Sequence, residues 1–412
     1  MNNAKPMHCQ IVIAGGGSAG ISVAAALKSA RPELQISLIE PSPHHYYQPA
    51  WTLVGGGIMK QQQTVREQAH LVPKGVEWIR NRVTAFDPDN NQLSLETGTI
   101  LEYQILVVAL GLQLDWGAVE GLEQTLGKNG VASNYSYELA PYTWECVNNF
   151  KGGRALFTQP PMPIKCAGAP QKILYLAADH WRRNGISAES HFFTQGGAMF
   201  GIPFYAKALD KVIAGYGATP HFGMNLTSVD GPRQIATFTD KDANTFTEKF
   251  DFLHVTPPQS APDVIKQSAL SGATGWVEVN RDSLRHQRFG NVFALGDCTD
   301  TSNAKTAAAV RRQFPVVVSN LLATLDQNTA VTTHYDGYGG CPLTTEKGKI
   351  MMAEFRYDGE VVSSFNLDPR VPRRCYWWMK KHLFPFLYWH VILKGRNWRK
   401  PEAKPRPGLL EK

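Results

Sequence analysis

The chain has 412 residues, of which 43% are hydrophobic and 19% charged, with six cysteines and a formal net charge of +7. This length suffices for two or three folded domains, and the composition is that of an ordinary globular protein. It excludes a disordered or fibrous chain, and six cysteines are too few for a scaffold built on disulfides.

The first elements expected are a buried strand at Gln10–Ala14, a helix over Ile21–Ala30 and a second strand at Gln35–Ile39, which ends at Glu40. The turn before the helix carries a G-x-G-x-x-G pattern, namely Gly15, Gly17 and Gly20. This βαβ arrangement is typical of a dinucleotide site, because the glycines let the backbone approach a pyrophosphate at the helix N-terminus. The carboxylate after the second strand is then expected to accept from ribose hydroxyls.

Two later segments indicate which dinucleotide the site binds. Tyr103–Gly111 reads as a buried strand that ends in glycine, and Asn291–Asp297 as another that ends in Gly-Asp before a helix from about Lys305. A strand followed by Gly-Asp is the second signature of FAD-binding two-domain reductases, in which the aspartate bonds the ribityl chain. Helix capping by that aspartate is the alternative, and it is compatible with the same role. FAD is therefore expected in preference to NAD.

The middle of the chain, from about Gly152 to Gln287, is expected to form a second α/β domain. Its strand-like segments are Ala155–Thr158, His191–Thr194 and Phe252–Val255. Where a pyridine-nucleotide enzyme would continue the first of these strands into a second glycine-rich turn, this chain has Pro160–Pro163 and then Cys166. Three prolines in place of the glycines argue against NAD(P)H as the electron donor.

Cys166 is the cysteine with the most reactive surroundings. It lies just before Pro170, which suits the first turn of a helix, and it is flanked by Lys165 and Lys172. A helix N-terminus and two cations favour the thiolate. Cys341 lies in the glycine-rich segment 335–343, expected as a loop, and by itself leaves structural and functional roles equally open.

The other four cysteines are expected to be structural or incidental. Cys298 follows Asp297 and is the chief competitor as a redox partner, although a small core residue at a strand–helix junction is the favoured interpretation. The remaining three are Cys9, Cys146 and Cys375. No metal site is expected.

The C-terminal tail is basic and aromatic. Residues 370–412 hold twelve Lys or Arg and two Glu, a net of +10, which leaves about −3 for the preceding chain. The aromatics and bases of Tyr376–Lys400 indicate an interfacial membrane segment, because Leu383–Leu393 is too short to span a bilayer. A helix that merely covers a domain is the alternative. An RNA-binding tail is disfavoured, and no nucleic-acid partner is expected.

Several strings resemble those of the mitochondrial-type sulfide:quinone oxidoreductases, the type II branch within the flavoprotein disulfide reductases. They are Glu40–Ser42, Tyr46–Gly55, Lys165–Lys172, Leu253–Pro258, Gly296–Thr299, Lys305–Val310, Tyr335–Leu343 and Pro385–Trp389. The resemblance covers the chain from Val12 to Gly395 and includes the segments of both candidate redox cysteines.

The resemblance implies an α/β fold with two Rossmann-like FAD/NAD(P)-binding-type domains in three-layer ββα form, plus C-terminal membrane-interfacial helices. The expected division is an FAD-binding domain over 1–115 and 288–330, a second domain over 116–287 carrying Cys166, and a C-terminal region over 331–412. It also implies a redox-active Cys166–Cys341 pair. The expected FAD-binding residues are Gly15, Gly17, Ser18, Ala19, Gly20, Glu40, Gln48, Val83, Lys172, Asp297 and Lys305.

The implied activity is FAD-dependent oxidation of hydrogen sulfide with reduction of a membrane quinone. Hydrosulfide attacks the disulfide, and the family pattern implies a persulfide on Cys341 and a Cys166 thiolate facing the flavin. The sulfur then passes to an acceptor, which is left open between sulfite, a thiol, cyanide and a growing polysulfide. The quinone type and the oligomeric state are also left open. No secretory or transit segment fits before the first strand, so a peripheral location on the cytoplasmic face of a bacterial inner membrane is expected.

Three alternatives remain. A type II NADH:quinone oxidoreductase would share the fold and the tail, but it would need the missing second glycine cradle. A flavocytochrome sulfide dehydrogenase would need export and a haem partner. A flavin-bearing binding protein without turnover would not need two intact cysteines.

Overall fold

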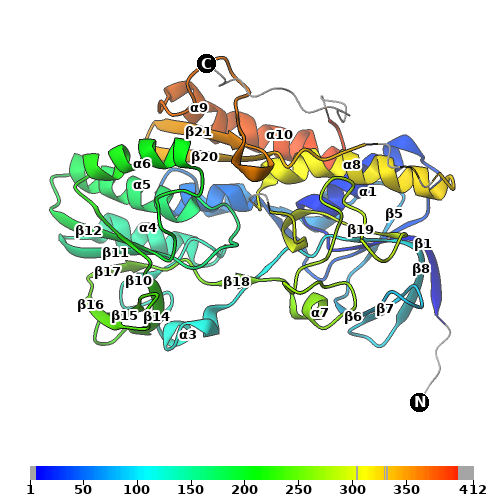
Figure 1. Ribbon diagram of the computed structural model, residues 1–412, viewed down its shortest axis with the longest axis horizontal. Helices are drawn as coiled ribbons and strands as arrows, with labels where there is room; N and C mark the ends of the chain where they lie inside the picture. The colour runs from blue at the N-terminus through cyan, green and yellow to red at the C-terminus, as the bar shows by residue number, and fades with distance from the viewer. Residues whose placement is uncertain (1–5, 303–304, 329, 331–332, 398–412) are drawn as a thin grey trace.

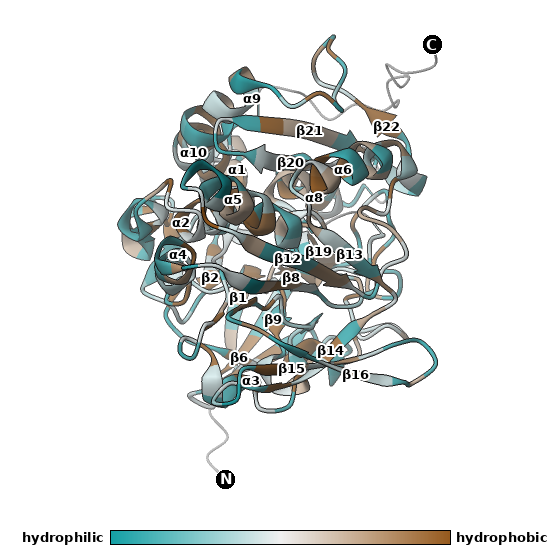
Figure 2. Cartoon of the chain, turned by 90° about the vertical axis from the view of Figure 1, so that its left-hand side faces the viewer, coloured by the Kyte–Doolittle hydropathy of each residue, from teal (hydrophilic) through white to brown (hydrophobic). Residues whose placement is uncertain are grey.

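The computed structural model describes residues 6–302, 305–328, 330 and 333–397. Two sheets with parallel strands lie side by side, and a hairpin and the C-terminal helices lie across them (Figure 1). Hydrophobic residues gather on interior strands, while hydrophilic residues dominate the outer surfaces of helices (Figure 2). The α/β fold expected from the sequence is confirmed.

The first sheet contains the N-terminal strands. Its order is β5-β2-β1-β8-β7-β6, with β19 beside β8. The strands are β1 (Met7–Ala14), β2 (Ile36–Ile39), β5 (Val76–Ile79), β6 (Val83–Asp87), β7 (Gln92–Leu95), β8 (Ile100–Val108) and β19 (Val292–Ala294). β1 is parallel to both β2 and β8, and its last four residues are buried. The carboxyl ends of β1, β2, β8 and β19 therefore meet at one edge, where an α/β sheet binds its ligand.

Helices α1 (Ser18–Ala30) and α8 (Ala307–Leu325) pack against each other beside this sheet. α1 follows β1 after a three-glycine turn, and α8 begins two residues after the position expected from the sequence. The strand and helix types expected for this unit are confirmed.

The second sheet consists of parallel strands in the order β10-β17-β11-β12-β13. They are β10 (Val131–Ala132), β11 (Gly153–Gln159), β12 (Ala188–Thr194), β13 (Thr219–Phe222) and β17 (Phe252–His254). One face packs on helices α4 (Ala140–Asn149), α5 (Ala169–Arg183) and α6 (Pro203–Gly215). The other packs on the antiparallel strands β14 (Asn225–Asp230) and β15 (Ile235–Thr239), and β16 (Thr245–Lys249) pairs with β15.

Alternation along the strands explains these three layers. Phe157 and Phe192 face the helices, whereas Leu156 and Phe193 face the antiparallel sheet. The chain passes from the first sheet to the second after β8 and returns after β17, and short strands β9 (Gln113–Leu114) and β18 (Gln259–Ser260) pair at that crossing. The domain limits at 115/116 and 287/288 stay predictions.

The C-terminal region begins with a hairpin of β20 (Gly339–Glu346) and β21 (Lys349–Phe355), followed by β22 (Val361–Val362). It ends with α9 (Arg374–Trp378), a π-helical turn (Met379–Leu383), α10 (Phe384–His390) and a 3₁₀ turn (Ile392–Lys394). In Figure 1 these elements lie along the top, above both sheets.

The prediction of a loop around Cys341 is wrong, because this residue lies in β20 and pairs with Ala353. Gly and Pro lower the strand propensity of the segment, but β20 is an edge strand, where a proline is tolerated.

The remaining short helices and strands are α2 (Trp51–Gly55), α3 (Leu122–Thr125), α7 (Asp263–Lys266), β3 (His44–Tyr46) and β4 (Val65–Glu67). In the part of the chain that the structure describes, no helix has both the length and the apolar character needed to cross a bilayer.

Candidate functional site

The glycine-rich turn after β1 is built for close approach. Gly15 has φ +108°, and a Cβ there would lie 2.4 Å from a carbonyl oxygen just after β8. A Cβ on Gly20 would lie 1.9 Å from the Gly15 carbonyl oxygen, so helix and turn pack only with glycine at this point. Gly17 differs, since a Cβ there would meet nothing within 4 Å. The turn is thus tight on its inner side and open where a phosphate would lie.

Glu40 extends this open side. One carboxylate oxygen accepts from the Gly16 N–H at 2.9 Å and the other from the Ser42 N–H at 2.9 Å. These two bonds hold the carboxylate at the end of β2 and leave each oxygen a further lone pair for a hydroxyl.

A cavity of about 1300 Å³ runs from this turn to the C-terminal helices. It is lined by the predicted cofactor residues Gly15, Gly17, Ser18, Ala19, Glu40, Gln48, Val83, Lys172, Asp297 and Lys305. Gly20, the remaining one, packs behind the turn. An open glycine cradle at a helix N-terminus and a fixed carboxylate after the second strand fit FAD.

Cys166 occupies the turn between β11 and α5. Its φ is +56°, a left-handed conformation that non-glycine residues seldom adopt and that concentrates at functional sites. Its N–H donates to the Lys305 carbonyl at 2.9 Å, and its own carbonyl accepts from the Ala169 N–H at 2.7 Å. Both bonds hold the thiol at the wall of the cavity.

Cys341 meets Cys166 from the hairpin. The two sulfurs are 3.0 Å apart although the residues are 175 positions apart in the chain, and both are free thiols. Cys341 is fully buried behind Cys166 and packs against Gly168, where a Cβ would come within 2.9 Å of its sulfur. The structure therefore brings together the two cysteines singled out in the sequence.

The surroundings separate the pKa values of the two thiols. The hydrogen bond with Cys341 and then the ammonium of Lys172, 3.0 Å from the sulfur, lower the pKa of Cys166 against the effect of burial. The same thiol–thiol bond and burial raise the pKa of Cys341. Lys165, also expected to favour the thiolate, donates to Gln48 Oε1 at 2.8 Å, and its effect on Cys166 stays a prediction.

Cys298 is a core residue. It is fully buried, and its thiol lies 3.4 Å from the carbonyl oxygens of Val108 and Leu295. Burial raises the pKa of this thiol to about 11. Both observations favour the structural interpretation made from the sequence.

Lys380 is a site residue that the sequence did not reveal. Its position in the basic tail predicted a membrane-facing cation, but it lies in the π-helical turn, buried, and lines the cavity. Burial, then the charge of Lys172, lowers its pKa to about 7. Its own charge helps to lower the pKa of Cys166.

Aromatic residues of the tail also face inward. Tyr388 is 2% exposed, and its hydroxyl lies 2.6 Å from both Ser18 Oγ and His45 Nε2. Tyr376 and Trp389 are buried too, so an interfacial role for these three is wrong. The reason is that the C-terminal segment packs on α1 and on β21. Trp398, Arg399 and Lys400 lie outside the described residues.

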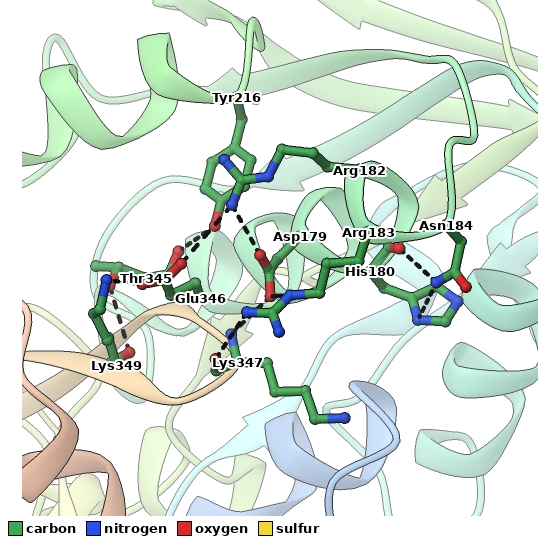
Figure 3. A network of polar contacts seen from close by, with 10 residues as sticks. All are labelled: Asp179, His180, Arg182, Arg183, Asn184, Tyr216, Thr345, Glu346, Lys347 and Lys349. Carbon is green, nitrogen blue, oxygen red and sulfur yellow. Dashed lines mark hydrogen bonds and ion pairs between the residues drawn. The ribbon is translucent and has the colours of Figure 1, made fainter.

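A polar network ties α5 to the hairpin at the end opposite the thiols (Figure 3). Asp179 is fully buried and accepts from the Lys347 N–H at 3.0 Å in the hairpin turn and from Arg182 and Arg183 at 2.9 Å each. Arg183 also donates to the Lys347 carbonyl at 3.2 Å. Because α5 follows Cys166 and β20 carries Cys341, this network fixes the two elements that hold the pair.

Residues 9–141 match the family model described as pyridine nucleotide-disulphide oxidoreductase, the class that the turn and the paired thiols define. The chain is 38% identical over 392 residues to the mitochondrial sulfide:quinone oxidoreductase of Mus musculus, covering 94% of this chain and 87% of that protein. It is 41% identical over 392 residues to that of Dictyostelium discoideum, with 94% and 86% covered. The chain belongs to the sulfide:quinone oxidoreductase family, whose members are FAD-dependent flavoproteins.

Solved structures share the fold. The sulfide:quinone oxidoreductase of Aquifex aeolicus superposes with a TM-score of 0.79 at 19% identity, covering 95% of this chain and 92% of that one. NDH2 of Plasmodium falciparum in complex with NADH gives 0.54 at 12% identity, covering 72% and 64%.

Proposed function

We propose that this chain oxidises hydrogen sulfide and reduces a membrane quinone, with FAD as cofactor and Cys166 and Cys341 as the redox pair. The observation that carries the proposal is the 3.0 Å approach of these thiols at the wall of a cavity that starts at the dinucleotide turn. Membership in the family supports the same activity.

The difference in pKa between Cys166 and Cys341 gives the two cysteines different roles. In the disulfide form, hydrosulfide attacks the Cys341 sulfur, the S–S bond breaks, and its electron pair stays on Cys166. Cys166 is the better leaving group because its pKa is the lower of the two, and Lys172 holds the resulting thiolate. Cys341 then carries the persulfide. FAD, which the glycine turn and Glu40 would hold, would supply a two-electron acceptor between the thiols and the quinone.

The C-terminal segment supports a peripheral membrane contact and a quinone route. Trp378 and Phe386 are 57% and 56% exposed and lie among basic residues of the tail. The cavity is lined at this end by Leu383, Phe384 and Leu387, so an apolar ring has a path from the membrane side toward the flavin site. The cytoplasmic face of a bacterial inner membrane is the proposed location, and fractionation of the native cells tests it.

No observation favours a type II NADH:quinone oxidoreductase, because the turn after β11 holds Pro160–Pro163 and Cys166 in place of a glycine cradle. The flavin-bearing binding protein is likewise disfavoured by the approach of the two thiols.

The test is anaerobic addition of sulfide to the FAD-loaded protein, with flavin absorbance followed before and after quinone. Sulfide is expected to bleach the flavin and quinone to restore it. Cys166→Ser and Cys341→Ser are each expected to abolish bleaching while FAD stays bound. Cys375→Ser, at an exposed thiol, is the matched control and should behave as the unmodified protein.

Cys298→Ser discriminates the redox partner. Because Cys298 sits in the core of the first sheet, this variant should keep substantial activity. A dead Cys298→Ser enzyme with bound FAD, or full activity in either variant of the proposed pair, contradicts the assignment.

A further inference from the structure

We propose that Glu354 is a proton donor to the quinone and that it is reloaded from solvent through the hydroxyl of Ser364. This inference rests on the proposed function. It assigns a residue to the uptake of protons by the quinone, a step in which the two thiols take no part.

The β20–β21 hairpin presents different residues on its two faces. Cys341 pairs with Ala353, and both belong to the apolar cluster formed with the second sheet and α5. Glu354 is the next residue of β21, and successive side chains of a strand point to opposite faces. With Gly340, its partner on β20, and Met352 it lines the cavity. The thiol of Cys341 and the carboxyl of Glu354 therefore lie on opposite faces of the same hairpin.

Gly340 lets the cavity face of the hairpin approach α8. A Cβ on Gly340 would lie 3.3 Å from the Ala308 Cβ and 3.6 Å from the Tyr338 hydroxyl oxygen. Ala308 also lines the cavity and follows Lys305, a predicted FAD-binding residue, by three positions. The carboxyl opposite Gly340 thus lies next to the predicted cofactor residues, although none of those residues comes from the hairpin.

A hydrogen-bond network holds the carboxyl of Glu354, which is 3% exposed. Its Oε1 accepts from the hydroxyls of Tyr338 and Ser364 at 2.5 Å each, and its Oε2 accepts from the Ser364 N–H at 2.7 Å. All three residues line the cavity, and Ser364 is exposed. A hydroxyl can both donate and accept a proton. The buried carboxyl is therefore one hydroxyl away from solvent.

The surroundings of this carboxyl suit a quinone ring. Met352 and Phe365 line the cavity beside it, and sites for small ligands are mostly apolar walls with a few placed polar groups. Among the described residues after position 330 that line the cavity, Glu354 is the one carboxyl. Lys380 lines the same region, but its charge acts on Cys166. Glu354 is thus the acid placed for the quinone.

The step balances with the electrons of the proposed function. Reduction of a quinone to a quinol takes up two electrons, which sulfide oxidation supplies, and two protons. Glu354 gives its proton to one quinone oxygen, where an O–H bond forms, and is left as the carboxylate. Water then returns a proton to the carboxylate through the Ser364 hydroxyl. The other quinone oxygen takes its proton from water.

Glu354→Gln tests the proposal, because it keeps the shape of the side chain and removes the acidic proton. In stopped-flow absorbance, reoxidation of the reduced holoenzyme by a short-chain quinone is expected to slow by on the order of a hundredfold. Reoxidation by ferricyanide, which takes electrons without protons, should stay unchanged. The rate of flavin bleaching by sulfide should stay unchanged too. Glu360→Gln, at an exposed glutamate that does not line the cavity, is the matched control.

Two further readouts separate a proton donor from a structural residue. The Kd of the quinone for the oxidised holoenzyme, a measurement without turnover, is expected to be the same in Glu354→Gln and the unmodified protein. Added acetic acid should restore part of the quinone rate of Glu354→Gln, because a small acid can replace the missing carboxyl. Ser364→Ala keeps its N–H and removes the hydroxyl, so it should slow quinone reduction severalfold.

An unchanged rate of quinone reduction in Glu354→Gln overturns the proposal. Equal slowing with quinone and ferricyanide, or loss of FAD, also overturns it, because Glu354 then supports the fold or the cofactor. If Glu354→Gln does not fold, an unchanged quinone rate in Ser364→Ala is the contradicting result. If sulfide fails to bleach the unmodified holoenzyme, the proposed function fails instead. Reoxidation by quinone after reduction with dithionite then still tests Glu354.

Discussion

Cys166 combines a left-handed backbone, a thiol partner and an ammonium within hydrogen-bond reach. The reactive cysteine and its flanking Lys172 were both predictable, because a proline-marked helix start and nearby lysines are local signals. The burial of Lys380 was not predictable, since it depends on contacts of the C-terminal segment with residues more than 300 positions earlier, such as the Pro49 carbonyl that accepts from Lys380 Nζ. At the scale of single residues, the feature to test is how the neighbouring charges change the pKa of Cys166.

Lys172→Met is expected to raise the pKa of Cys166, because the thiolate loses the cation 3.0 Å away. The pH profile of Cys166 alkylation, followed on its peptide by mass spectrometry, should move to higher pH by on the order of one unit. The sign follows from the charge: a cation favours the deprotonated form, and its removal favours the thiol.

Lys211→Met, at an exposed lysine on α6, is the control for the loss of a charge. FAD content is measured in parallel because Lys172 is also a predicted FAD-binding residue. An unmoved alkylation profile would show that Lys172 does not support the thiolate.

At the scale of the element, α5 and the β20–β21 hairpin form a frame with the thiols at one end and Asp179 at the other. From Ala169 to Asp179 the helix rises about 15 Å at roughly 1.5 Å per residue. A contact at the far end can therefore set the angle at which β20 presents Cys341.

Asp179→Ala is expected to lower the free energy of unfolding by about 2 kcal/mol, because it leaves the Lys347 N–H and two arginines without their carboxylate. Reoxidation of the reduced pair to the disulfide should also slow. Urea unfolding and thiol titration over time measure these effects. Asp89→Ala, at an exposed turn, is the control. If the Asp179→Ala protein is destabilised but its thiols reoxidise at an unchanged rate, the network contributes to stability and not to the placement of the cysteines.

The turn after β11 carries a second prediction at this scale. NADH and NADPH are expected not to reduce the flavin at a useful rate. A pyrophosphate cradle needs glycines without a Cβ and with free N–H groups, whereas the three prolines of Pro160–Pro163 carry Cβ atoms and have no N–H. Stopped-flow absorbance measures this, with sulfide as the positive control. Rapid bleaching of the flavin by NADH would contradict this prediction and support a type II NADH:quinone oxidoreductase.

At the scale of the whole molecule, the C-terminal segment has two faces. Tyr388, Trp389 and Lys380 face the protein, whereas Trp378 and Phe386 face outward. Truncation from Cys375 onward would therefore strip part of the core as well as the membrane contact, and it is a poor test of membrane binding.

The double variant Trp378→Ser/Phe386→Ser is expected to lose most of its binding to anionic liposomes in flotation, because two large apolar side chains leave the interface. Turnover with a long-chain quinone should fall, whereas sulfide bleaching stays unchanged. Leu367→Ser, an exposed apolar residue outside these helices, is the control. Undiminished flotation of the double variant would contradict the interfacial role.

Much of this architecture followed from local patterns: the glycine turn after β1, the strand at Ala155–Thr158, and the strand before Asp297. Pairings between distant segments did not. Cys341 in a strand, Lys165 on Gln48 and Tyr388 on Ser18 all depend on where the C-terminal region and the second sheet come to lie. The spacing of residues along the sequence does not reveal these contacts. The pairing of Cys166 with Cys341 was predicted only because the resemblance to a family implied it.

The bond between Tyr388 and Ser18 joins residues 370 positions apart. During synthesis the ribosome releases the N-terminal strands, the turn and α1 long before α10, so the dinucleotide site stays incomplete until Tyr388 has emerged. Contacts of such sequence separation form slowly. Flavin binding should therefore follow the synthesis of α10, and a nascent chain stalled before Tyr388 should emerge without its cofactor.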